Sequence, residues 1–306
     1  MTFETLLVPT DGSDVADATA RRAFDFAEAL DASVHVLSVA DSAVATGVGY
    51  SGERASIREQ LKEKAAARAT SLRRLAADRG LDATAVTREG IPAEEIVDYA
   101  TSEPVDGIVI GTSGRGGIAR AVVGSVTDKV VRAASVPVVT ITPEAAESDD
   151  GWTPIESILL PTDGSEAATA ALDCGLELAE QFDATVHLLS VADSDLASAL
   201  DTVSDDAVDS SNHLLEQAET YLDTLATDAR DRDLEVVITA VEGTPSEKIV
   251  EYAASEDVDL IAMGTTGRGG FERVLLGSVT DDVIRTATKP VMILPDVTNY
   301  TGRQND

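Results

Sequence analysis

The stretch that decides the fold is Gly111-Thr-Ser-Gly114, followed nine residues later by Gly124-Ser125. It comes directly after the apolar run GIVIG (107–111) and leads into a stretch of helical character. A glycine-rich turn between a strand and a helix exposes backbone N–H groups, and the start of the helix adds the positive end of a dipole. The pattern therefore predicts a phosphate site at a strand-to-helix turn.

The whole chain repeats around this pattern. Gly264-Thr-Thr-Gly267 is followed, again nine residues later, by Gly277-Ser278. The offset between matching residues is 152 early in each copy and 153 later, so one inserted residue separates two copies of one domain. The matching pairs are Asp11 and Asp163, His35 and His187, Pro92 and Pro245, and Tyr99 and Tyr252. A length of 306 residues fits two domains, each large enough to bury its own core.

Composition marks the boundaries of the two domains. The acidic, proline-bounded stretch around 144–154 is typical of a linker, and 298–306 has no apolar periodicity, which is typical of a tail. We therefore expect a nucleotide-binding domain over 1–143, a linker over 144–154, a second nucleotide-binding domain over 155–297 and a tail over 298–306.

Short β-branched runs alternate with helical stretches throughout the chain. The expected strands are 5–9, 33–39, 83–89, 107–111 and 137–141, and in the second copy 157–161, 185–191, 235–242, 260–264 and 290–294. The expected helices are 14–30, 53–79, 93–102 and 121–134, and then 166–182, 211–231, 246–255 and 274–288. Strands that are apolar almost throughout, each followed by a helix, indicate a parallel sheet covered on both faces. The fold class is α/β and doubly wound.

The charge of the chain limits its environment and its partners. Asp and Glu number 55 against 23 Lys and Arg, which gives a formal net charge of −32, yet 43% of residues are hydrophobic. This composition indicates a folded protein whose carboxylate surface suits concentrated salt, as in a halophile, although an ordinary acidic cytosolic protein is the alternative. Such a surface opposes binding to nucleic acid and to anionic membranes. The chain also lacks a signal sequence and a membrane span, so we expect it in the cytoplasm.

The two PTDGS stretches at 9–13 and 161–165, together with the two glycine patterns, resemble the universal stress protein family in its ATP-binding branch. The resemblance covers nearly the whole chain, in a tandem two-domain form. It implies a five-stranded parallel sheet of order 3-2-1-4-5 in each domain, with helices on both faces. In that order Asp11 and the Gly111–Gly114 turn meet at the topological switch point, where open α/β sheets bind ligands. It further implies that the two domains pair through their fifth strands as an intramolecular pseudo-dimer, and it leaves a further homodimer open.

Each candidate residue has a role in a nucleotide site. Gly111 and Gly114 are expected to allow positive φ and close approach of the backbone to phosphates, and Ser125 to bind a phosphate oxygen. Asp11 would hold the ribose or adenine side or reach a metal through water, and the resemblance implies that the backbone of Val39 meets the adenine edge. The candidate nucleotide-binding residues are Pro9, Thr10, Asp11, Val39, Gly111, Gly114, Arg115, Gly124, Ser125, Val126 and Thr127 in the first copy, and Pro161, Thr162, Asp163, Val191, Gly264, Gly267, Arg268, Gly277, Ser278, Val279 and Thr280 in the second.

Simpler interpretations exist for the same residues. The glycines could form ordinary turns, Ser125 could be only a helix N-cap, and Asp11 could form only an Asx turn. Arg115 and Arg268 could pair with surface carboxylates instead of phosphates. His35 and His187 lie in mid-strand and are expected to be structural, and Cys174 is expected to be a buried small hydrophobe.

Two classes of function follow from these residues. The first is a nucleotide-dependent stress-response or regulatory module that binds ATP, or AMP or ADP, with Mg left open and its protein partners unknown. The second is a slow ATPase or another ATP-using enzyme on the same fold. The sequence shows no catalytic or metal constellation, no Walker A pattern, and TDGSD and TDGSE where an ATP-pyrophosphatase loop would stand. We therefore favour the binding module, with weak ATP hydrolysis left open.

Overall fold

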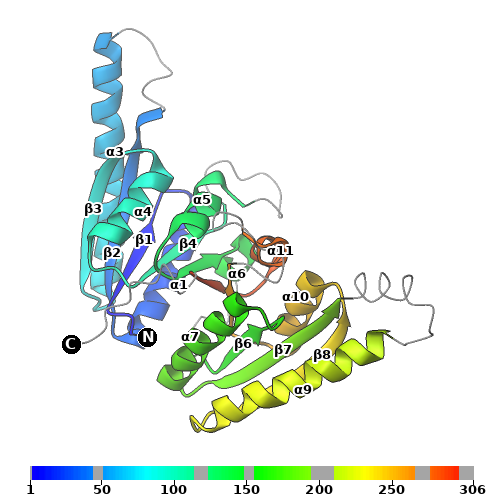
Figure 1. Cartoon of the computed structure of the whole chain (residues 1–306). Helices are drawn as coiled ribbons and strands as arrows, with labels where there is room; N and C mark the ends of the chain where they lie inside the picture. The colour runs from blue at the N-terminus through cyan, green and yellow to red at the C-terminus, as the bar shows by residue number, and fades with distance from the viewer. Residues whose placement is uncertain are drawn as a thin grey trace. The chain divides into compact units, whose positions relative to one another are not determined.

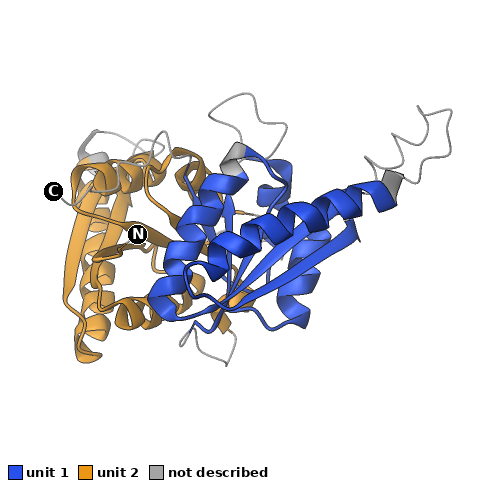
Figure 2. Cartoon of the chain, turned by 60° about the horizontal axis from the view of Figure 1, so that its bottom comes forward, with its two compact units in different colours: residues 1, 154–298 blue, residues 2–153, 299–306 orange. Residues whose placement is uncertain are grey.

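The chain divides into two compact units, shown in Figure 2. The first in chain order is Thr2–Thr153 (orange), and the second is Pro154–Thr298 (blue). The structure is a computed structural model, and it describes residues 2–43, 51–113, 123–147, 155–193, 210–265 and 276–295. Each unit contains one doubly wound α/β sheet, in which all the assigned strand pairs are parallel.

The first unit alternates strands and helices along the chain. Its sheet has the order β3-β2-β1-β4-β5. Helices α1 and α3 cover one face of the sheet, and α4 and α5 cover the other (Figure 1). The elements are β1 (Thr5–Pro9), α1 (Asp14–Leu30), β2 (Ser33–Asp41), α3 (Ser51–Asp78), β3 (Ala83–Gly90), α4 (Pro92–Ser102), β4 (Gly107–Gly111), α5 (Ser125–Ala133), β5 (Val138–Ile141) and α6 (Pro143–Glu147).

The second unit repeats this arrangement. Its strands lie in the order β8-β7-β6-β9-β10, which is again third, second, first, fourth and fifth along the chain. The elements are β6 (Ser157–Pro161), α7 (Glu166–Phe182), β7 (Thr185–Asp193), α9 (Ser210–Arg230), β8 (Val236–Gly243), α10 (Pro245–Ser255), β9 (Leu260–Gly264), α11 (Ser278–Thr286) and β10 (Val291–Leu294). The predicted fold class and strand order are confirmed. The pairing of the fifth strands into a pseudo-dimer, and any further homodimer, stay predictions.

The central strands are apolar because helices bury both of their faces. Leu6, Leu7 and Val8 of β1 are fully buried, as are Ile158 and Leu159 of β6. Parallel strands covered on two sides cannot show the alternating polar pattern of a half-exposed strand. This burial fixes β1 and β6 at the centre of each sheet, so their carboxyl ends lie at the switch point with the fourth strand.

A helix lies inside the segment that composition predicts as a linker. Pro143–Glu147 forms α6, which packs against α1 in the first unit. Ala145 and Ala146 are buried there, and the Arg22 side chain donates a hydrogen bond to the carbonyl of Ala146 at 3.4 Å. Two small alanines are enough for this contact because α1 comes close, which a count of acidic and proline residues does not reveal.

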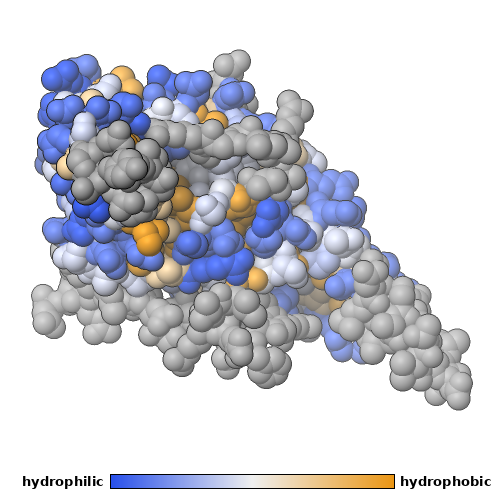
Figure 3. All heavy atoms as spheres, turned by 90° about the horizontal axis from the view of Figure 1, so that it is seen from above, coloured by the Kyte–Doolittle hydropathy of each residue, from blue (hydrophilic) through white to orange (hydrophobic). Residues whose placement is uncertain are grey.

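The surface reflects the acidic composition. The face shown in Figure 3 is mostly hydrophilic over the described residues, with apolar side chains visible in a limited central area. Within the described part of the chain, the large hydrophobic side chains that are exposed are Ile91 and Val237. Across the described ranges, every helix falls short of the length or the apolar character that a membrane crossing needs.

Candidate functional site

The loop that follows β1 is tied to the neighbouring strand and to the next helix. The Thr10 N–H donates to the Leu37 carbonyl of β2 at 2.8 Å, and the Ser38 hydroxyl donates to the Thr10 carbonyl at 2.9 Å. Gly12 follows with φ of +75°, a conformation that glycine adopts without strain. Its N–H donates to the Thr10 hydroxyl at 3.0 Å. These bonds hold the loop rigidly at the end of the central strand.

Asp11 and Ser13 organise the start of α1 from this loop. The Asp11 carboxylate accepts a hydrogen bond from the Ser13 N–H at 3.0 Å, which is the Asx turn considered from sequence. The Ser13 hydroxyl is the N-cap of α1 and accepts from the Ala16 N–H at 3.2 Å. One carboxylate oxygen of Asp11 therefore fixes the turn. A structural role and a ligand role are compatible for this side chain, because an ionised carboxylate can accept more than one hydrogen bond.

A second loop follows β4, and its two ends are joined by a hydrogen bond. The Thr112 N–H donates to the Ile141 carbonyl of β5 at 2.9 Å, which continues the strand pairing. The Gly124 N–H then donates to the Thr112 carbonyl at 2.6 Å. This bond brings the start of α5 back to the end of β4, so the nine-residue spacing between the glycines corresponds to a closed loop.

Close packing, and not a positive φ, is the reason for glycine at position 111. The prediction of a left-handed conformation at Gly111 is wrong, since the positive-φ glycines of the described chain are Gly12, Gly80, Gly164 and Gly243. Gly111 is the last residue of β4, and a Cβ there would lie 2.9 Å from the Thr19 Oγ1 atom of α1. Helix α1 passes too close to the end of the strand to admit a side chain.

Among the described residues, no side chain caps the start of helix α5. Gly124 is the N-cap and makes no capping bond, so Ser125 is the first helical residue and the simple N-cap interpretation of Ser125 is wrong. The first N–H groups of a helix have no partner within it. Ser125 is exposed and Val126 is half-buried. Asp128 in the first turn accepts from Arg132 at 2.8 and 2.9 Å, which offsets its negative charge.

Thr127 is buried and ties α5 to the strand. Its side chain is 3% exposed, and its hydroxyl donates to the Gly111 carbonyl at 2.7 Å. The sequence places Thr127 among the nucleotide-binding residues, but its hydroxyl is already used inside the protein. The backbone N–H of Thr127, in the first turn of α5, is the group that remains for a ligand.

The second unit reproduces most of these contacts. In the loop after β6, the Ser165 N–H donates to the Asp163 carboxylate at 3.0 Å and the Thr162 N–H to the Leu189 carbonyl at 2.8 Å. At the start of α11, the Gly277 N–H donates to the Thr265 carbonyl at 2.8 Å and the Thr280 hydroxyl to the Gly264 carbonyl at 3.0 Å. Gly277 is the N-cap of α11, Ser278 is exposed and Val279 is half-buried. The backbone around the end of the sheet is therefore held in the same way in both units.

Strand pairing brings the two loops of each unit together. Strand β1 pairs with β4 on one side, with Leu6 opposite Gly107, and with β2 on the other, with Pro9 opposite Leu37. Strand β2 continues to Asp41, so Val39 lies on the part of β2 that extends past β1. Pro161 and Val191 occupy the same places in the second unit. The Asp11 turn, the backbone of Val39 and the start of α5 therefore surround one end of the sheet.

Several predicted residues lie outside the described part of the chain. They are Gly114, Arg115, Gly267 and Arg268. Their assignment to the site stays a prediction.

The structure adds one buried group that the sequence did not indicate. The Thr19 Oγ1 atom, beside Gly111, is buried without a hydrogen-bond partner, and Ala171 stands at this position in the second unit. Two residues earlier on α1, burial raises the pKa of Asp17, and the nearby Asp14 and Asp11 raise it further, while Arg21 lowers it. A buried threonine on a helix looks like any other core position in sequence, so no pattern distinguishes it.

The histidines of the strands have a structural role, as predicted. The Tyr99 hydroxyl lies 2.9 Å from Nδ1 of His35, and Tyr252 makes the same contact with His187. Burial lowers the pKa of both histidines. Cys174 on α7 is half-buried instead of buried, and burial raises the pKa of its thiol, which opposes a nucleophilic role. In the part of the chain that the structure describes, no three His, Cys, Asp or Glu side chains gather to hold a metal ion.

Comparison with known proteins assigns both halves of the chain. Residues 2–142 and 154–295 each match the Universal stress protein family. A universal stress protein from Methanocaldococcus jannaschii is 34% identical over 139 residues, covering 45% of this chain and 82% of that protein. Another, from Mycobacterium tuberculosis, is 31% identical over 223 residues, covering 71% of this chain and 70% of that protein.

A solved structure agrees with the fold over the whole chain. The crystal structure of a universal stress protein from Archaeoglobus fulgidus covers 96% of this chain and 97% of its own, with a TM-score of 0.70 and 19% identity. At this identity the likeness shows the fold alone. The family matches and the relative that spans both units carry the assignment further: this chain belongs to the universal stress protein family and contains two copies of its domain in tandem.

Proposed function

We propose that this chain is a nucleotide-binding regulatory module that binds one ATP molecule in each unit. The observation that carries the proposal is the hydrogen bond from Gly124 to Thr112, repeated by Gly277 and Thr265. It places the uncapped start of a helix at the end of the fourth strand, beside the turn that contains Asp11 or Asp163. A site with this geometry suits an anionic ligand in a chain whose overall charge would repel one.

The described residues fit the parts of a nucleotide. The first N–H groups of α5 and the exposed Ser125 hydroxyl suit phosphate oxygens, because they are donors at the positive end of a helix dipole. The Asp11 carboxylate suits the ribose hydroxyls, because the hydrogen bond from the Ser13 N–H holds this acceptor group in position. The backbone of Val39, on the part of β2 that extends past β1, meets the edge of a base in this proposal. In this proposal the nucleotide supplies a conformational signal, and the residues described hold it without a catalytic step.

The direct test is the nucleotide content and the binding stoichiometry of the purified chain. We expect mass spectrometry of denatured protein to find an adenine nucleotide, and calorimetric titration in molar KCl to give about two ATP sites per chain. Zero stoichiometry in protein that is shown to be folded by circular dichroism would overturn the proposal.

Two matched variants assign the sites. Ser125→Glu and Ser278→Glu each put a carboxylate at an exposed first helical position, where the helix dipole tolerates it and a phosphate does not. We expect each variant to keep its stability and to lose one ATP site, and the double variant to lose both. Thr101→Glu, at an exposed position near the end of α4, is the control for an added charge elsewhere.

A further inference from the structure

The two units differ at a helix position that, in the first unit, lies over the loop after the first strand. In the first unit, a Cβ built on Gly12 would lie 2.7 Å from both Cδ and Nε of Arg68. The Arg68 side chain, from α3, therefore crosses directly over the residue that follows Asp11. Helix α3 packs on β2 and β3, so it brings Arg68 to the loop from the face of the sheet that α1 also covers.

The register of the two units places Tyr221 at the same position. Both helices end in the same turn, in which the Leu81 N–H donates to the Ala76 carbonyl and the Leu234 N–H to the Ala229 carbonyl. Counting back from this turn pairs Arg68 with Tyr221 without a gap, because both helices are continuous over the interval. The flanking burial agrees: Ala69 and Leu222 are buried, as are Leu72 and Leu225.

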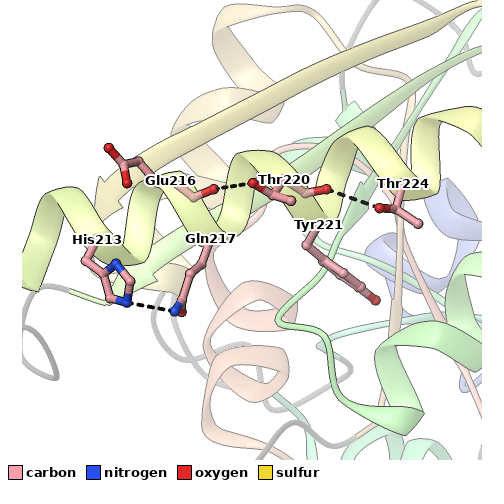
Figure 4. A pocket seen from close by; sticks show the side chains of 6 residues that line it. All are labelled: His213, Glu216, Gln217, Thr220, Tyr221 and Thr224. Atoms are coloured by element: carbon pink, nitrogen blue, oxygen red, sulfur yellow. Dashed lines mark hydrogen bonds between the residues drawn. The ribbon is translucent and has the colours of Figure 1, made fainter.

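The neighbouring positions on the same helix face differ in the same direction. Lys64, one turn before Arg68, corresponds to Gln217, one turn before Tyr221. On α9 the face continues to His213, whose Nε2 lies 2.9 Å from Nε2 of Gln217. Figure 4 shows Tyr221 and the His213–Gln217 pair projecting to the same side of α9. Together with Glu216, Thr220 and Thr224 they line a hollow of about 480 Å³. The first unit thus presents two cationic residues where the second presents an aromatic and an amide.

The charged residues of α1 and α7 do not offset the difference in charge between α3 and α9. Asp17 of α1 adds a carboxylate that the second unit lacks, since Thr169 stands there. Arg21, one turn further, acts on the pKa of Asp17 in the opposite direction to burial. Its counterpart in α7 is Asp173, so the second unit is more negative on this helix as well.

We propose that the two nucleotide sites are not equivalent: the site of the first unit selects for phosphate charge through Arg68, and the site of the second unit selects for the nucleoside through Tyr221. The inference rests on the proposed function. A guanidinium beside the site strengthens binding of an anion through charge and through its fixed donors, whereas a tyrosine ring offers a flat apolar surface for a base or ribose. The ratio of ATP affinity to adenosine affinity is then higher at the N-terminal site than at the C-terminal site.

The experiment measures ATP and adenosine affinity at each site alone. Ser278→Glu leaves only the N-terminal site able to bind ATP and Ser125→Glu only the C-terminal site, because the added carboxylate opposes a phosphate. Adenosine has no phosphate, so its affinity is measured by displacement of ATP, which reports on the one site that holds ATP. All titrations use one fixed KCl concentration. We expect the ratio of ATP affinity to adenosine affinity to be about tenfold higher at the N-terminal site, which corresponds to one lost or gained charge-assisted contact.

Exchange of the two residues then tests their role. Arg68→Tyr in the Ser278→Glu background should lower the ratio about tenfold, and Tyr221→Arg in the Ser125→Glu background should raise it. Arg74→Tyr, at an exposed position of α3, is the matched control and should leave it unchanged. Equal ratios at the two sites, or ratios that the exchange does not move, overturn this inference and leave the proposed function standing. Absence of nucleotide binding in the folded wild-type chain overturns both.

Discussion

The hydrogen bond from Thr127 to Gly111 gives a sharp test of how the site is held. Replacing Thr127 with valine keeps the β-branched shape but removes the hydroxyl that donates to the Gly111 carbonyl at 2.7 Å. Thr127 is 3% exposed, so water cannot readily take its place. Loss of a buried hydrogen bond of this kind costs about 1–3 kcal/mol. At roughly 3 °C per kcal/mol for a unit of this size, the midpoint of thermal unfolding should fall by about 3–9 °C.

Thr101→Val is the matched control for this measurement. The Thr101 hydroxyl also donates to a backbone carbonyl, that of Val97, at 2.9 Å, but Thr101 is exposed. Water replaces this bond, so the change in stability should stay within about 0.5 kcal/mol. Thermal unfolding followed by circular dichroism in molar KCl compares the two. Equal midpoints for Thr127→Val and Thr101→Val would refute the argument that the buried bond holds α5 to β4.

The same variant links stability to binding. If the bond positions the start of α5, Thr127→Val should weaken ATP binding in the first unit about tenfold and leave the second unit unchanged, which calorimetric titration can resolve. Thr280→Val, whose hydroxyl donates to Gly264 at 3.0 Å, should have the reciprocal effect. A variant that is destabilised yet binds ATP normally at both sites would separate the role of the bond in stability from any role in the site.

Three further predictions concern the glycines, pH and salt. Gly114→Ala and Gly267→Ala should each remove one ATP site with little change in fold, because a Cβ would obstruct a phosphate. Normal titration stoichiometry in both variants would show that these glycines only form a turn. Burial lowers the pKa of His35 and His187 in the folded state, so the unfolded state takes up protons first as pH falls. Denaturation curves should therefore show that the free energy of unfolding falls below about pH 6.5. The double variant His35→Gln/His187→Gln should reduce this fall, and His213→Gln, at an exposed position of α9, should leave it unchanged. With 55 acidic against 23 basic residues, the thermal midpoint should rise steeply from dilute to molar KCl while ATP binding persists, and equal stability in dilute buffer would contradict a halophilic adaptation.

The order of elements could be predicted from sequence because strands and helices here have distinct compositions. Runs such as TLLVP at 5–9 and GIVIG at 107–111 are apolar throughout, and both became central strands. The start of α5 was less predictable. Sequence places the helix at 121–134, whereas α5 is Ser125–Ala133, because the bond from Gly124 to Thr112 sets its first turn. That bond joins two backbone groups, and no side-chain pattern encodes it.

The roles of individual site residues were harder to predict than their positions. Gly111 was expected to need a positive φ, but the constraint is the approach of Thr19 from α1, which depends on how a helix packs across the sheet. Helix α3 shows the same difficulty. Its buried stripe contains Ala65, Ala69 and Ala76 beside Leu72, so the helix lies close to the sheet, while the apolar Ile57 and Leu61 nearer its start are only half-buried. Periodicity gives a face and cannot give the distance at which that face packs.

The repeat separates what the fold requires from what each site can change. The ties that position backbone are the same in both units: Asp106 accepts from the N–H groups of Glu4 and Thr5, and Asp259 accepts from those of Glu156 and Ser157. These carboxylates bind main chain at the far end of the sheet from the site, so neither copy can lose one without losing strand alignment. Arg68 and Tyr221 are different residues at one half-buried helix position, beside Ala69 and Leu222, which anchor the two helices. A duplicated domain built this way can alter ligand preference in one copy at no cost to its sheet, and a position of this kind is where two sites of one chain should diverge.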